Sequence, residues 1–234
     1  MKIEFSLYVD GSRIRSEQYG DIKNAKKILL FCHGFPGSNR LCKLWGNIKN
    51  EPISLVEINY RGDKKSEGKF SFLGSIKDIT TVAYYLKDHF HVPLYALGLS
   101  MGGFYITNIV QQHPCIFEKI ILLNPVVDTR ALFFNKPIME ELWMNARSSL
   151  SLKISEDYDE EIKILTGKYN PAIFVNELHT PITIVQSTTD EVLPPEIAKA
   201  FHTSLNCEKE YLEVPNAKHD LKGNEEQIIR TILI

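Results

Sequence analysis

The chain has 234 residues, of which 44% are hydrophobic and 24% are charged, and its 27 Lys and Arg nearly balance 29 Asp and Glu, giving a net charge of −2. This composition excludes an intrinsically disordered chain, because disorder requires low hydrophobicity and high net charge. The near-neutral balance gives no electrostatic basis for binding nucleic acid. The length fits one α/β domain, since such domains commonly reach roughly 200 to 250 residues.

The cysteines are far apart in the sequence and form no Cys-x-x-Cys pair: Cys32, Cys42, Cys115 and Cys207. Without such a pair or a histidine cluster at ligand spacing, we predict no metal site and reduced thiols. Residues 1–7 alternate polar with apolar side chains and lack the apolar run of a signal peptide. No stretch approaches the roughly 18 apolar residues that span a membrane, so the sequence predicts a cytoplasmic protein.

Strand and helix patterns follow one another along the chain. Residues 3–9 and 13–19 alternate in polarity around Asp10-Gly11, which predicts an antiparallel hairpin. The short apolar run 27–32 is typical of a strand buried on both faces. Apolar residues three and four apart predict an amphipathic helix over 74–90. Further strands are predicted at 53–60, 94–97, 119–123, 182–186 and 210–214, and further helices at 39–49, 101–112, 196–205 and from Glu225 to the C-terminus.

This alternation predicts a doubly wound, mostly parallel α/β sheet covered by helices on both faces, with the hairpin at one edge. Residues 125–179 have no strand pattern and are too few for a core of their own, so we predict a helical cap insertion within a single domain, 1–234. Four large apolar side chains of this insertion are candidates for a substrate pocket: Phe133, Phe134, Trp143 and Met144. They equally suit ordinary packing of helices onto the sheet.

A Gly-x-Ser-x-Gly motif, Gly98 to Gly102, lies directly between a predicted strand and a predicted helix. In this context the motif indicates a nucleophile elbow. A side chain at Gly98 or Gly102 would collide with its neighbours in so tight a turn. We therefore expect Ser100 in a strained backbone conformation, with its hydroxyl raised above the sheet as the candidate nucleophile.

A serine hydroxyl needs a general base to remove its proton, so a histidine must lie near it in the fold. Of the seven histidines, His219 lies in the loop after the last predicted strand, at the sheet edge where Ser100 is expected. Five others lie in or beside helices and turns: His89, His91, His113, His179 and His202. His33 follows the strand 27–32, and we expect it to hold its loop by hydrogen bonding, with a second base as the alternative.

The carboxylate that orients the histidine is expected at a neighbouring strand end. Asp190 follows the strand 182–186 and gives the chain order Ser100, Asp190, His219, which is the nucleophile–acid–base order of one particular fold. Other carboxylates remain alternatives for the acid: Asp128, Glu191 and Asp220.

The loop His33-Gly34-Phe35-Pro36 is the expected second half of an oxyanion hole. Backbone N–H groups that bind the oxyanion of a tetrahedral intermediate usually provide the largest catalytic contribution. The N–H of Met101, the residue after the candidate nucleophile, is one expected donor. Phe35 provides the other, because Pro36 has no N–H.

Together these motifs resemble the α/β-hydrolase family over nearly the whole chain. Within this family the sequence is most similar to small serine esterases and lipase-like hydrolases, including the cinnamoyl-esterase, monoacylglycerol-lipase and serine-aminopeptidase-like groups. They share a segment after the second parallel strand that corresponds to residues 59–70. The sequence departs from that pattern at Asp63, where many relatives have a histidine.

The resemblance implies a carboxylic ester hydrolase that acts on a small or medium acyl substrate through an acyl-enzyme. His219 would take the proton of Ser100, and Asp190 would stabilise the imidazolium. The N–H groups of Phe35 and Met101 would bind the oxyanion. No metal or organic cofactor is needed, and the expected partner is a small-molecule acyl substrate. Cleavage of a peptide, thioester or carbon–carbon bond by the same residues is one alternative, and a ligand-binding protein with little turnover is another.

Overall fold

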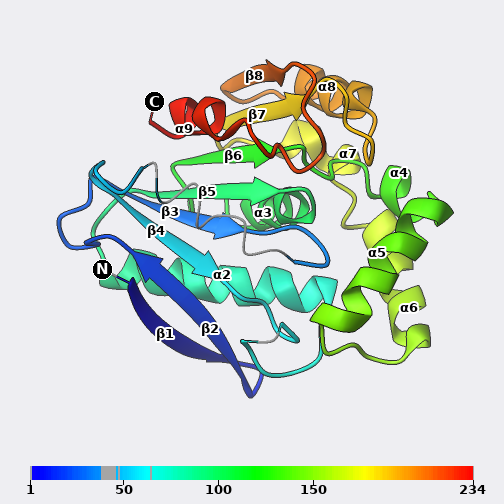
Figure 1. Cartoon of the computed structure of the whole chain (residues 1–234), viewed down its shortest axis with the longest axis horizontal. Coiled ribbons are helices and arrows are strands. Elements are labelled where there is room, and N and C mark those ends of the chain that lie inside the picture. Colours follow the sequence, from blue (N-terminus) through cyan, green and yellow to red (C-terminus); the bar gives the residue numbers. More distant parts are fainter. Residues whose placement is uncertain (1, 38–45, 47, 64, 234) are drawn as a thin grey trace.

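The computed structural model describes residues 2–37, 46, 48–63 and 65–233, and within them one eight-stranded sheet has the order β1-β2-β4-β3-β5-β6-β7-β8 (Figure 1). The strands are β1 (Lys2–Val9), β2 (Ser12–Tyr19), β3 (Lys27–Cys32), β4 (Ile53–Ile58), β5 (Leu94–Leu99), β6 (Lys119–Leu123), β7 (Ile182–Ser187) and β8 (Lys209–Val214). β3 to β8 run parallel, whereas β1 and β2 form an antiparallel hairpin whose second strand pairs with β4. The predicted doubly wound fold is confirmed.

Helices cover both faces of the sheet because its parallel strands are apolar at successive positions. Ile28 and Leu30 of β3 face α2 (Phe72–His89), α3 (Met101–Gln112) and α8 (Pro195–Ser204) within one core cluster. Leu29 and Phe31 face the opposite side, which α9 (Glu225–Leu233) covers. The predicted strands and these helices begin and end within two residues of their observed positions. The helix predicted at 39–49 lies mostly outside the described residues.

The insertion between β6 and β7 is helical, as predicted, and lies beyond the carboxyl ends of the strands (Figure 1). It contains α4 (Thr129–Phe133), α5 (Lys136–Ser149), α6 (Ser155–Thr166), α7 (Pro171–Phe174) and a 3-10 turn (Val175–Glu177). We call residues 125–179 the cap.

Buried polar side chains fasten the cap to the amino end of α2. Glu161 of α6 accepts hydrogen bonds from the hydroxyl of Ser71 (2.6 Å) and the N–H of Leu73 (2.8 Å) through its Oε1 atom. The hydroxyl of Tyr158 donates to the carbonyl of Phe70 (2.8 Å). Because a carboxylate near a helix amino terminus also meets the positive end of the helix dipole, Glu161 stabilises the start of α2.

Two carboxylates are buried side by side where β2 meets β4. Glu17 and Glu57 are register partners, each only 2% exposed. Burial alone would raise the pKa of Glu17, but hydrogen bonds from Lys65 (2.6 Å), Lys2 (2.9 Å) and Tyr19 (2.8 Å) outweigh it and lower this pKa to about 2. The Oε1 atom of Glu57 has no hydrogen-bond partner among the described residues, and burial beside the charge of Glu17 raises the pKa of Glu57 to about 7.

We predict that Glu57→Gln raises the free energy of unfolding above that of wild type at pH 8. The difference between variant and wild type should be roughly 2 to 3 kcal/mol more favourable to the variant at pH 8 than at pH 4.5. Between pH 4.5 and about 7 the folded protein keeps the Glu57 proton that the unfolded chain loses, so wild-type stability falls over this range and levels off above it. Glutamine has no proton to lose. Urea denaturation of both proteins at the two pH values measures the difference, and a difference independent of pH would contradict the prediction. Glu17→Gln is the control, and its effect on stability should change with pH in the opposite direction. The lowered pKa of Glu17 stabilises the wild-type protein above pH 4.5, and the variant lacks this contribution.

Candidate active site

Ser100 lies in the turn between β5 and α3 with φ 54° and ψ −118°, a conformation that residues with a side chain rarely adopt. Its N–H donates to the carbonyl of Leu123 on β6 (2.9 Å). Its carbonyl accepts from the N–H groups of Gly103 (2.9 Å) and Val126 (3.1 Å). The predicted strained elbow is therefore present, and hydrogen bonds from both β6 and α3 hold it.

Close backbone contacts explain the glycines around Ser100. A Cβ atom at Gly102 would lie 1.9 Å from the carbonyl oxygen of Cys32, at the end of β3, and one at Gly98 would lie 2.7 Å from the carbonyl oxygen of Gly102. A Cβ at Gly34 would lie 3.0 Å from the Cβ of Ser100 and 3.5 Å from its Oγ. The loop after β3 thus lies directly against the candidate nucleophile, as the sequence predicts for an oxyanion loop.

His219 and Asp190 are in direct contact. The Nδ1 atom of His219 lies 2.8 Å from Oδ2 and 2.9 Å from Oδ1 of Asp190. The carboxylate is fully buried, and its Oδ1 also accepts the N–H groups of Val192 (2.8 Å) and Leu193 (2.9 Å). Since a carboxylate can only accept, Nδ1 of His219 must be the protonated nitrogen of the neutral ring. The Nε2 atom is then unprotonated and able to accept a proton.

The hydroxyl of Ser100 forms no hydrogen bond with a residue that the structure describes, including His219. Such catalytic hydrogen bonds are often long before substrate binds and shorten in the complex, so this geometry is compatible with base catalysis. The structure brings Ser100, Asp190 and His219 to the same edge of the sheet, at the carboxyl ends of β5, β7 and β8.

The alternative carboxylates make other contacts. Asp128 caps the amino end of α4 through its side chain. Glu191 accepts the backbone N–H of His219 (3.0 Å), so it touches the main chain of this residue. Asp220 accepts a backbone N–H two residues further along its own loop. Asp190 is the carboxylate with a hydrogen bond to the ring of His219.

His33 is the first residue of the loop after β3 and is buried. Its Nδ1 atom lies 2.8 Å from the carbonyl oxygen of Gly34, and its own carbonyl accepts a hydrogen bond from the hydroxyl of Tyr60 (2.9 Å). Burial lowers the pKa of His33, and the Gly34 carbonyl and the charge of Asp63 only partly oppose this effect. A neutral histidine bonded within its own loop suits the predicted supporting role of His33 and Gly34 better than that of a second base.

Two backbone N–H groups next to Ser100 are available to bind an oxyanion. Met101 is the first residue of α3, where helical N–H groups have no partner within the helix. The N–H of Phe35 has no hydrogen bond to the described part of the chain. The ring of Phe35 is packed against Phe72 (centroid distance 5.1 Å) and Trp143 (5.0 Å), which fixes the backbone of this residue.

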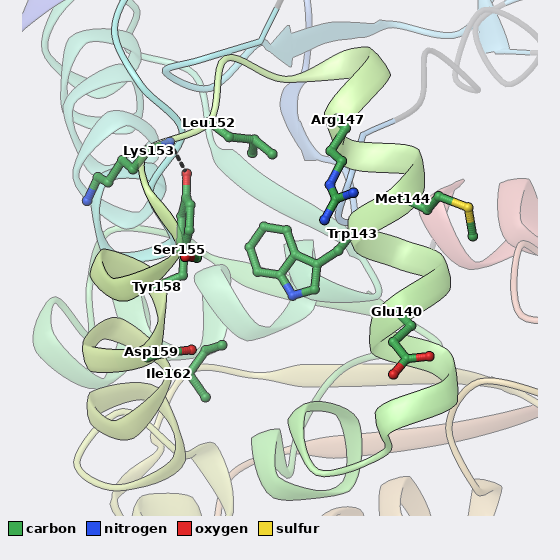
Figure 2. A pocket seen from close by; sticks show the side chains of 10 residues that line it. All are labelled: Glu140, Trp143, Met144, Arg147, Leu152, Lys153, Ser155, Tyr158, Asp159 and Ile162. Carbon is green, nitrogen blue, oxygen red and sulfur yellow. Dashed lines mark hydrogen bonds between the residues drawn. The ribbon is translucent and has the colours of Figure 1, made fainter.

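The cap contains a cavity of about 500 Å³ between α5 and α6 (Figure 2). The ring of Trp143 projects from α5 toward Tyr158 on α6, with centroids 4.9 Å apart, and the same indole touches Phe35 of the loop after β3. Charged side chains also line the cavity, among them Glu140 and Arg147 on α5. Trp143 therefore connects the cap cavity with the candidate oxyanion loop.

Only two of the four pocket candidates, Trp143 and Met144, line this cavity. Phe133 instead packs its ring on Phe72 in the core (5.4 Å), and Phe134, at the end of the same short helix, is 67% exposed. Sequence reasoning missed Tyr158, because it lies in the acidic run 156–161. Tyr158 lies four residues before Ile162 and seven before Leu165, and this helical spacing is the signal that could have found it.

Among the described residues, no group of three or more His, Cys, Asp or Glu side chains is placed to hold a metal ion. No helix within the described ranges has the length and apolar character required to cross a bilayer. Cys32, Cys115 and Cys207 are free thiols, and Cys42 lies outside the described residues.

Known proteins of similar sequence or similar fold cover nearly the whole chain. A monoglyceride lipase homolog of Monkeypox virus is 21% identical over 96% of this chain and 93% of the viral protein. Est1E from Butyrivibrio proteoclasticus, with ferulic acid bound, has a TM-score of 0.78 at 18% identity, covering 97% of this chain and 96% of Est1E. A monoacylglycerol lipase of Paleococcus ferrophilus has a TM-score of 0.71 at 16% identity, covering 94% and 96%. At these identities the two solved structures show a shared fold.

Two family models match the chain. One, described as PhoPQ-activated pathogenicity-related protein, matches residues 151–233. The other, described as serine aminopeptidase S33, matches residues 23–167, more than half of the chain, including the loop after β3 and the turn at Ser100. The resemblance expected from the sequence is thereby confirmed, and the chain belongs to the serine aminopeptidase S33 family of α/β-hydrolases.

Proposed function

We propose that the protein is a serine hydrolase that cleaves carboxylic esters of small or medium acyl substrates through an acyl-enzyme intermediate. The observation that carries the proposal is the buried contact of Asp190 with His219 at the sheet edge where the strained turn presents Ser100. Open α/β sheets bind their substrates at this edge, near the point where the strand order reverses. Here the order reverses at β3, between β4 and β5.

In the first stage Nε2 of His219 accepts the hydroxyl proton of Ser100 as the oxygen attacks the substrate carbonyl carbon. The ring becomes cationic, and the carboxylate of Asp190 stabilises this cation. Because hydrogen bonds from two backbone N–H groups already fix the carboxylate, little reorganisation accompanies the proton transfer. The ester C–O bond then breaks, and His219 returns the proton to the departing alcohol.

The negative charge of the tetrahedral intermediate is bound by the N–H groups of Phe35 and Met101. The close approach of Gly34 to Ser100 supports this assignment, since it brings the loop after β3 within contact of the reacting oxygen. In the second stage His219 activates a water molecule, which attacks the acyl-enzyme and releases the acid. Each step uses side chains and N–H groups of this chain alone.

Trp143 and Met144 are the residues that we assign to substrate selection. Supporting this, the indole of Trp143 lines the cap cavity and also contacts Phe35 of the candidate oxyanion loop. The names of similar proteins agree with an ester substrate, since they include a monoglyceride lipase homolog and a monoacylglycerol lipase, and Est1E has ferulic acid bound. The description of the matching family favours a second candidate, an aminopeptidase that uses the same three residues.

A substrate panel distinguishes these activities. We expect hydrolysis of p-nitrophenyl esters, monoacylglycerols or methyl ferulate to exceed that of aminoacyl anilides and acyl thioesters in kcat/KM. Trp143→Ala should shift the preferred acyl or alcohol size, because each methylene in an apolar pocket is worth about 1 to 3 kcal/mol. Phe134→Ala, which removes an exposed ring outside the cavity, is the matched control and should leave the preference unchanged. Cleavage of anilides without cleavage of esters would favour the aminopeptidase.

A further inference from the structure

On one side, the loop that contains His219 forms hydrogen bonds with the loop that contains Asp190. The hydroxyl of Thr189 donates to the carbonyl of Ala217 (2.7 Å), and Glu191 accepts the N–H of His219 (3.0 Å). These contacts and the ring–carboxylate contact all come from the same segment after β7. They fix His219 relative to Asp190, but they do not reach Ser100.

Asn124 bonds the histidine loop from the other side. This residue follows β6 directly, is 0% exposed and has φ 40°, a left-handed conformation that asparagine tolerates better than most residues. Its Oδ1 atom accepts the N–H of Ser187 (2.7 Å). Its Nδ2 group donates to the carbonyl of His219 (2.7 Å) and more weakly to that of Lys218 (3.4 Å). Both the oxygen and the nitrogen of the side-chain amide therefore form hydrogen bonds.

The backbone on either side of Asn124 holds the nucleophile. The carbonyl of Leu123 accepts the N–H of Ser100 (2.9 Å), and the N–H of Val126 donates to the carbonyl of Ser100 (3.1 Å). Residues 123–126 thus bind the backbone of Ser100, while the side chain within this same segment binds the backbone of His219. This places Asn124 at the junction between the two halves of the candidate triad.

We propose that Asn124 is a positioning residue that sets the distance between His219 and Ser100; this inference rests on the proposed function. Proton transfer requires donor and acceptor within hydrogen-bond reach, and a misplacement of about 1 Å costs roughly 100-fold in rate. An amide suits the position, because Ser187 presents a donor and His219 an acceptor. Aspartate accepts on both sides and would face the carbonyl oxygens of Lys218 and His219.

Two substitutions separate positioning from folding. Asn124→Asp and Asn124→Gly are both compatible with the left-handed backbone. Each should lower kcat about 10- to 100-fold while KM stays within about twofold, because Asn124 is fully buried and its amide bonds only to the protein. An unchanged kcat in both variants would overturn the proposal.

Asn108 provides a matched control on α3. It is buried, and its Nδ2 group donates to the carbonyls of Phe104 (3.0 Å) and Tyr169 (3.1 Å), which are outside the histidine loop. Asn108→Asp loses the same kind of contact and should lower the melting temperature about as much as Asn124→Asp. Its kcat should remain within about threefold of wild type. If Asn108→Asp loses as much kcat as Asn124→Asp, general destabilisation explains the effect and the proposal is wrong.

Labelling with a fluorophosphonate tests the inference apart from the proposed function, because phosphonylation of Ser100 needs His219 as its base. We expect wild type to be labelled at Ser100, and Asn124→Gly to be labelled more slowly by the same factor that its kcat falls. Wild-type protein that is not labelled would overturn the proposed function together with this inference. Wild type and folded Asn124→Gly labelled at equal rates would overturn this inference alone.

Discussion

Ser100→Ala is expected to reduce ester hydrolysis by roughly 10⁴- to 10⁶-fold, because it removes the oxygen that forms the acyl-enzyme. The fold should persist. The hydroxyl has no hydrogen bond to a described residue, and the contacts that hold the strained turn are made by the N–H and carbonyl of Ser100, which alanine keeps. The kcat for the best ester of the panel, together with a urea unfolding curve for each protein, measures both expectations.

Ser75→Ala is the matched control for this experiment. Ser75 is also buried, but its hydroxyl donates to the carbonyl of Ser71, the N-cap of α2 (2.8 Å), away from the candidate site. We expect this variant to lose a little stability and to keep its kcat. If Ser100→Ala retains about a tenth of the wild-type activity, the assignment of Ser100 as the nucleophile is wrong.

Asp190→Asn is expected to lower kcat by about 10³- to 10⁴-fold with little change in KM. Asparagine has the same shape, and its oxygen can still accept the N–H groups of Val192 and Leu193. In that orientation its NH₂ group faces Nδ1 of His219. The ring must then carry its proton on Nε2, the atom that has to accept the proton of Ser100. The loss therefore arises from the wrong tautomer, and a pH profile of kcat alongside KM measures it.

Asp128→Asn tests the rival acid under matched conditions. Asparagine is as good a helix N-cap as aspartate, and its oxygen can still accept the side-chain N–H of Asn170 that Asp128 now accepts (2.8 Å). We expect kcat within about threefold of wild type. A large loss with Asp128→Asn and none with Asp190→Asn would transfer the role of the acid to Asp128.

Much of the fold could be predicted because its strands are short apolar runs that end at glycine, proline or polar residues. The strand Lys27–Cys32 and the helix Met101–Gln112 have their predicted ends. The pairing of β2 with β4 could not be predicted, since no local pattern shows that Glu17 and Glu57 become neighbours. Their unequal pKa values depend on that long-range contact.

The candidate triad could be located by position, because each residue follows a predicted strand and the carboxyl ends of parallel strands meet at one edge. The contacts that choose among rivals, such as Asp190 over Asp128, appear only in three dimensions. Asn124 also follows a strand, but a lone asparagine there has no distinguishing pattern. In the cap, α4 has only five residues, too few for periodicity to show that Phe133 is buried and Phe134 exposed.

The attachment of the cap to the start of α2 has a consequence for engineering. Glu161 and Tyr158 bind Ser71, Leu73 and Phe70, about 90 positions earlier in the chain. A chimera that exchanges only the insertion between β6 and β7 with that of a relative would leave the hydroxyl of Ser71 and the N–H of Leu73 without their acceptor. The unit that can be grafted between relatives is therefore discontinuous, and it comprises the insertion together with residues 70–73.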